Sequence, residues 1–123
     1  MSRLTKPSVI FRERVVPAYA NYLNHPLSEY HANNLAEALN NKVEWTYLYL
    51  DEVDRARLNG ATLASFRTGL LTEHRALHVM SDLADAATDA YYEKEGVLFV
   101  KRFDTPFPSA AKQAFEFWRD WPD

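Results

Sequence analysis

The chain of 123 residues suits one domain and is too short for two, and its 47% hydrophobic and 25% charged residues are ordinary for a folded protein. A net charge of −3, with scattered lysines and arginines, argues against a nucleic-acid partner. The absence of cysteine excludes disulfides, thiolate nucleophiles and cysteine-based zinc sites. The sequence lacks a signal-peptide pattern and a membrane-spanning apolar run, so we expect a cytoplasmic protein without a membrane partner.

The amino end combines a β-like run with a short helical pattern. Ser8–Phe11 is rich in β-branched and aromatic residues, and we expect it to pair with a second such run, Val97–Val100, as a minor two-stranded β ribbon. A short helix is predicted over about 17–24. Both elements would flank a larger helical unit.

Two long helical patterns follow, over 26–58 and 62–94, and each predicts a helix of about 50 Å. Asn59-Gly60 and Glu95-Gly96 end these patterns with residues that accept the left-handed backbone conformation. The connection between the two helices is very short, so we expect them to fold back into an antiparallel hairpin.

A heptad-like seam supports this hairpin, because apolar residues recur at alternating spacings of four and three in both patterns. The antiparallel register predicts contacts of Val43 with Leu77 and of Leu39 with Met80. Further expected pairs are Leu50 with Leu70, Val53 with Phe66 and Ala36 with Ala84, and the seam continues to Ala87 and Tyr91.

A last short helix is predicted over about 108–120, with Ala111, Ala114, Phe115 and Trp118 on one side. The predicted fold class is therefore all-α: a single helical domain, 1–123, in which a helical bundle is built on the long antiparallel hairpin.

His74 and His78 lie four residues apart in the second long pattern, and Asp82 follows at helical spacing. Such a face could bind a divalent metal ion. The other interpretation is a solvated polar stripe, because the seam places these residues near or on the outside of the hairpin. We favour the stripe and expect no metal ion or other cofactor.

Glu73 occupies the seam itself, opposite Thr46. A buried carboxylate is costly unless it is hydrogen-bonded. Glu73 is therefore a general acid or base with a shifted pKa, part of a polar layer that fixes the register, or a residue that reaches water because Gly69 shifts the helix. We favour the polar layer over the catalytic role. Arg67 and His74 also have the spacing at which HEPN-type ribonucleases place the residues that stabilise and protonate a cleaved phosphodiester. We assign no catalytic residue and keep Arg67, Glu73 and His74 as the alternative.

The segment Ser81–Asp89, followed by Gly96–Val100 and Phe117–Trp121, resembles a loose group of uncharacterised bacterial helical proteins that are similar to HEPN domains. The resemblance covers the last half of the chain. Ser81 stands where that group has arginine, and Thr88-Asp89 stand where it has Lys-His. The resemblance therefore implies a HEPN-like bundle without the basic pair that would handle phosphate.

A second apolar strip, Ala38, Trp45, Leu48 and Tyr49, runs along the first long pattern. The short terminal helices cannot cover all of it, so we expect a two-fold homodimer through this strip. The sequence as a whole favours a non-catalytic binding or interaction module with a protein partner, such as a regulator in a bacterial or phage system. The alternatives are a HEPN-like ribonuclease that uses Arg67 and His74 and a metal-dependent helical-bundle enzyme.

Overall fold

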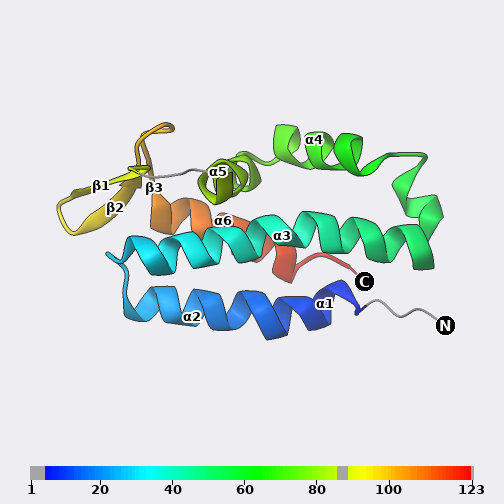
Figure 1. The fold of residues 1–123 in the computed structure, drawn as a ribbon, viewed down its shortest axis with the longest axis horizontal. Helices are drawn as coiled ribbons and strands as arrows, with labels where there is room; N and C mark the ends of the chain where they lie inside the picture. The colour runs from blue at the N-terminus through cyan, green and yellow to red at the C-terminus, as the bar shows by residue number, and fades with distance from the viewer. Residues whose placement is uncertain (1–4, 86–88, 123) are drawn as a thin grey trace.

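In the computed structural model, which describes residues 5–85 and 89–122, one long helix runs along the molecule and the other elements pack around it. Figure 1 shows this helix, α3, between the amino-terminal helix and α4, with a small sheet at one end of the molecule. The architecture is mostly helical, but the sheet means that the predicted all-α class is only partly correct.

The amino-terminal helix is longer than the predicted 17–24. It consists of α1 (Pro7–Ile10), a π-helical turn (Phe11–Val15) and α2 (Val16–Asn24). Pro17 has no N–H and its ring crowds the carbonyl four residues earlier, a clash that the wider π turn accommodates. The β ribbon predicted for Ser8–Phe11 is therefore wrong, because this run is helical.

The helix α3 (Glu29–Val53) is the helix predicted over 26–58, shortened at both ends. The hydroxyl oxygen of Ser28 caps it by accepting a hydrogen bond from the backbone N–H of His31 at 3.3 Å. A short 3-10 helix, Arg55–Leu58, follows α3 and ends at Asn59 and Gly60, both with positive φ, as the Asn-Gly turn predicted.

The second predicted helix, 62–94, is not continuous. It forms α4 (Leu63–Glu73) and α5 (Arg75–Asp85), with His74 in an extended conformation between them, and ends in a strand. Ala87, which the predicted seam includes, lies outside the described residues. In Figure 1, α5 is seen nearly end-on, so it crosses α3 steeply instead of running antiparallel to it.

The break has a physical basis in the two halves. None of the residues of α4 is fully buried, whereas α5 buries Ala76, Leu77, Val79, Met80 and Leu83. Turning at His74 allows this strongly apolar face to pack on α3 and α6. Leu39, Val43, Leu77 and Met80 do share one buried cluster, but the continuous seam of a long hairpin is absent: Val53 is 47% exposed.

The sheet is antiparallel, in the order β1 (Tyr91–Lys94), β2 (Val97–Val100), β3 (Thr105–Pro106). The strand at Val97–Val100 is confirmed, but its partner is Tyr91–Lys94, which was predicted to be helical. Glu95 and Gly96 both have positive φ and form the two-residue turn that pairs Tyr91 with Val100 and Lys94 with Val97. This local hairpin outcompetes the distant pairing with the amino end.

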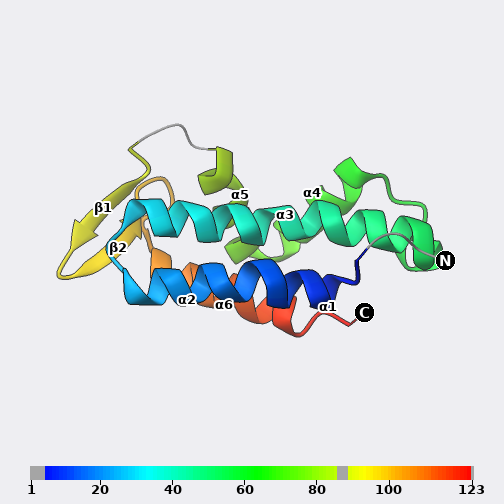
Figure 2. The ribbon, with the colours of Figure 1, turned by 60° about the horizontal axis from the view of Figure 1, so that its bottom comes forward.

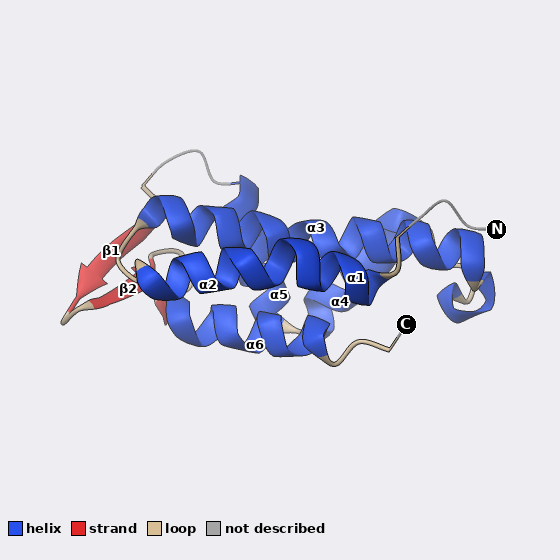
Figure 3. Cartoon of the chain, turned by 90° about the horizontal axis from the view of Figure 1, so that it is seen from below, coloured by secondary structure: helices blue, strands red, loops and turns tan. Residues whose placement is uncertain are grey.

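The helix α6 (Phe107–Arg119) confirms the helix predicted over 108–120. Its apolar face is buried through Phe107, Ala110, Ala111, Ala114 and Trp118. Figure 3 shows α6 and α3 flanking the amino-terminal helix, with the sheet at the end of the bundle. Across the described parts of the chain, none of the helices combines the length and apolarity that crossing a membrane requires.

Replacing Leu77, which is 2% exposed, with alanine should lower the free energy of unfolding by about 2–5 kcal/mol, because truncation leaves a cavity between α5 and α3. Urea unfolding followed by circular dichroism measures this loss. The matched control is Leu23→Ala on α2, where the side chain is 57% exposed and the expected loss is under about 0.5 kcal/mol. Equal losses in the two variants would contradict the packing of α5.

Candidate functional site

The surface with the most distinctive composition is the outer side of α3, opposite its buried side. Tyr30 is 71% exposed and Leu48 is 42% exposed on this side, near the two ends of the helix. Between them lies a groove of about 210 Å³ that Arg14 and Ala18 of the amino-terminal helix line together with Asn34, Glu37, Ala38, Asn41 and Trp45 of α3. The groove runs along the interface between the amino-terminal helix and α3. These two helices lie side by side in Figures 1 and 2.

A cation–π contact shapes the wall of this groove. The guanidinium carbon of Arg14 lies 5.6 Å from the centre of the Trp45 ring, so an aromatic face and a positive charge are presented together. Asn34 and Asn41 add amide groups, and Glu37 adds a carboxylate. This mixture of apolar, amide and charged groups suits a protein partner better than a small substrate.

The structure divides the four residues of the predicted apolar strip. Ala38 and Trp45 are half-buried and line the groove, and Leu48 is exposed farther along α3. Tyr49 is only 8% exposed and packs with Leu50 and Leu58 in a small core cluster. Tyr49 therefore contributes to the interior, while the other three residues remain on or near the surface.

The alternative catalytic residues Arg67 and His74 contact different parts of the structure. Nη1 of Arg67 donates a hydrogen bond to Oδ1 of Asn40 at 2.9 Å, and the ring of His74 packs against Phe117 with 4.5 Å between ring centres. The Glu73 side chain is 76% exposed, and its carboxylate lies 4.0 Å from Nε2 of His74. The predicted burial of Glu73 opposite Thr46 is wrong, because the chain leaves the helix at His74 and α4 does not continue the seam.

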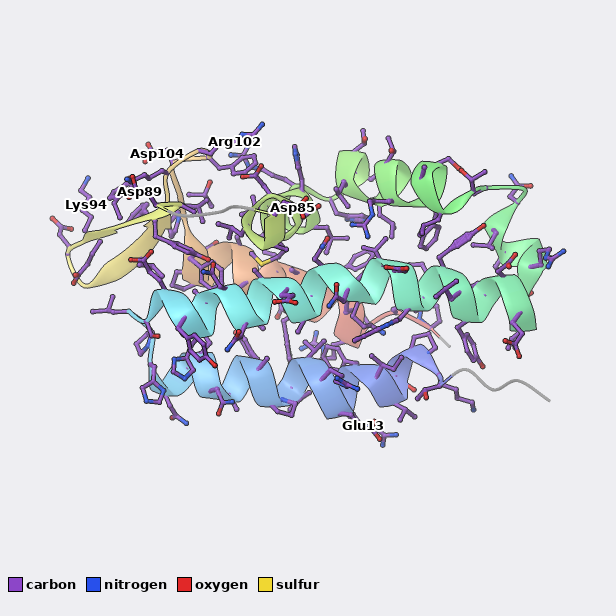
Figure 4. All side chains as sticks on the ribbon, viewed as in Figure 1. Glu13, Asp85, Asp89, Lys94, Arg102 and Asp104 are labelled. Carbon is purple, nitrogen blue, oxygen red and sulfur yellow. The ribbon has the colours of Figure 1, made fainter. Side chains whose placement is uncertain are left out.

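The alternative metal ligands are also dispersed. His78 is exposed beside Phe103, with 5.3 Å between ring centres, and Asp82 forms an ion pair with Arg102. Figure 4 shows Asp85 and Asp89 well apart, and Asp89 pairs with Lys101 at 2.7 Å. Among residues 5–85 and 89–122, no group of three or more histidines or carboxylates is arranged to hold a metal ion.

Sequence reasoning missed a buried lysine. Lys42 is fully buried, its Nζ donates a hydrogen bond to the Pro7 carbonyl at 2.6 Å, and it lies 5.2 Å from the centre of the Trp118 ring. The signal was present, because Lys42 and Thr46 continue the row of Leu35 and Leu39 at helical spacing. All four side chains are buried, so Leu35 and Lys42 widen the buried side of α3 beside the seam residues Leu39 and Thr46.

Two buried tyrosines join the bundle to the sheet. Tyr22 of α2 and Tyr91 of β1 both pack edge-on against Phe107 of α6. The Tyr91 hydroxyl donates to Oδ1 of Asn33 at 2.7 Å, whereas no partner for the Tyr22 hydroxyl is found within the described parts of the chain. Burial raises the pKa of Tyr22 to about 12 and also raises the pKa of Tyr91.

Lys42 and Tyr91 thus connect elements through buried hydrogen bonds, and the groove with Tyr30 and Leu48 places groups that could meet another molecule along the outer side of α3. Comparison of the chain with protein-family models, with curated proteins and with solved structures found no match. The geometry of this surface is therefore the basis for a functional assignment.

Tyr22→Phe should leave the free energy of unfolding at pH 7 unchanged or higher, because it removes a buried hydroxyl that lacks a partner among the described residues. The folded state binds the hydroxyl proton more tightly than the unfolded state. The stability that this provides is complete below the ordinary pKa of 10.0 and is lost as the pH rises through about 12.

The variant should therefore lose less stability than the parent protein between pH 9.5 and pH 11.5, in urea titrations at about half-unit pH steps. Tyr30→Phe, which alters an exposed tyrosine, is the matched control. A steeper alkaline loss in Tyr22→Phe than in the parent would contradict the assignment.

Proposed function

We propose that the protein is a non-catalytic helical interaction module that binds a protein partner through the outer side of α3. The observation that carries this proposal is the exposure of Tyr30 and Leu48 on either side of the groove that Ala38 and Trp45 line. Exposed aromatic and aliphatic side chains next to polar groups offer the apolar contact area and the hydrogen bonds that protein interfaces use.

The positions of the polar residues support a role in binding over a role in catalysis. A general acid or base needs a substrate-sized site beside it, and a nuclease needs its arginine directed at the phosphate. Arg67 is instead engaged by Asn40, and Glu73 extends into solvent. The ion pairs at the sheet end, Asp82 with Arg102 and Asp89 with Lys101, neutralise the charge there.

The first partner that we propose is a second copy of the chain, which would form a two-fold homodimer. A homodimer needs only one surface that is complementary to itself. Leu48 and Trp45 provide apolar contact area, while the amide and carboxylate groups of the groove can bind across the axis. A regulator in a bacterial or phage system would use the same surface when it binds another protein.

Light scattering after gel filtration at micromolar concentration should give the mass of a dimer. Leu48→Glu should shift the protein to the monomer, because a carboxylate would be buried against apolar groups of the partner. Leu23→Glu, at a 57% exposed leucine of α2, is the matched control and should remain a dimer. Circular dichroism checks that both variants are folded. A monomeric parent protein, or a dimeric Leu48→Glu variant, would refute the proposal.

A further inference from the structure

Six side chains form a straight row on the outer side of α3, because they follow one another at alternating spacings of four and three residues. Five of them are exposed, and Asn41 is half-exposed. The row consists of Tyr30, Asn34, Glu37, Asn41, Glu44 and Leu48. It lies opposite the buried side of the helix, which includes Leu39, Val43 and Thr46.

This row is symmetric about position 39 of the helix. Tyr30 and Leu48 are equally far from that position, and so are Asn34 and Glu44. Glu37 and Asn41 complete the symmetry at the centre. Each apolar residue is thus mirrored by an apolar residue, and each amide is mirrored by a carboxylate.

We infer that the outer side of α3 packs antiparallel against the same side of α3 in a second copy. The two-fold axis passes between Glu37 and Asn41, at the level of position 39 along the helix. This inference rests on the proposed function and adds the geometry of the contact. In an antiparallel pair each residue faces its mirror position, so Tyr30 faces Leu48 of the second copy. Asn34 faces Glu44 and Asn41 faces Glu37, and the symmetry repeats each of these contacts.

The chemistry of the row favours antiparallel packing of the two α3 helices over parallel packing. An asparagine amide donates hydrogen bonds and a carboxylate only accepts them, so every polar pair across the antiparallel contact is complementary. A parallel pair would instead bring Glu37 against Glu37 and Glu44 against Glu44. Like charges that face each other destabilise an interface, so this repulsion disfavours the parallel pair.

The residues that border the row on the groove side allow a second α3 helix to approach closely. Ala38 lies beside the two-fold axis at the edge of the groove, and its small side chain lets a second helix come near. Trp45, held by Arg14, borders the row toward Leu48. Tyr30 and Leu48 then provide apolar area at both ends of the contact, while the amide and carboxylate pairs fix the register at its centre.

Single-cysteine variants test the register, and the chain offers a clean background because it contains no cysteine. Asn34→Cys and Glu44→Cys keep Tyr30 and Leu48 in place. A mixture of the two variants should be joined by a short bis-maleimide, because these positions face each other. Each variant alone should stay uncrosslinked on a denaturing gel, because two copies of one position lie about 15 Å apart along the helix axis.

The control mixture pairs Asn34→Cys with Thr68→Cys, an exposed position on α4. Light scattering on every sample reports the oligomeric state separately from the crosslink. A dimer in which either variant crosslinks to itself, or in which the mixture does not crosslink, overturns the antiparallel pairing but leaves the proposed function intact. A monomer at all concentrations overturns both.

A charge rescue tests the central contact. Asn41→Asp places a carboxylate opposite Glu37 of the second copy, twice per dimer, and should weaken the dimer by at least about fivefold in Kd. Adding Glu37→Gln to that variant should restore the affinity. Asn24→Asp, which adds the same charge at the end of α2, should have no effect. Loss of affinity without rescue by Glu37→Gln would overturn the assigned contact.

Discussion

The structure depends on burial of one side of α3, because that helix is longer than any element that covers it. Ala32, Leu35, Ala36, Leu39 and Val43 on this side are almost inaccessible to water. Covering them takes the amino-terminal helix, α5 and α6 together, and each contributes apolar side chains to the same cluster. Since burial of apolar area is the main favourable term in folding, the short elements arrange themselves to complete this cover.

A polar contact lies inside this cover. The ammonium group of Lys42 needs hydrogen-bond acceptors to remain in the interior, and the carbonyl of Pro7 provides one. The Trp118 ring provides a cation–π surface from α6. Lys42 thereby connects the first turn of the amino-terminal helix to the last turns of α6. Such directional contacts specify one arrangement, whereas apolar packing alone tolerates several.

The opposite side of α3, which we propose as the interaction surface, differs in composition from an ordinary solvated helix face. A helix that is buried on one side and part of a bundle normally presents charged residues outward. Here the outward row has Tyr30 and Leu48 at its ends and amides among its carboxylates. Apolar ends add area to an association, and the polar centre penalises a shifted or parallel alignment. The same helix can therefore organise the fold on one side and a partner on the other.

The sequence by itself determined the features that depend on local chemistry. The Asn59-Gly60 and Glu95-Gly96 turns, α6 and the strand Val97–Val100 follow from nearby residues, because their backbone preferences and apolar periods are local. Only the tertiary structure decided the break at His74 and the helical state of Ser8–Phe11. The strand Tyr91–Lys94 depends on its local hairpin turn, which the helical periodicity of 62–94 concealed. The periodicity of 62–94 fits one long helix, but the turn at His74 packs the apolar face of α5 on α3 and α6. The partners of Lys42 were also decided by the tertiary structure, because Pro7 of α1 and Trp118 of α6 are distant from it along the chain.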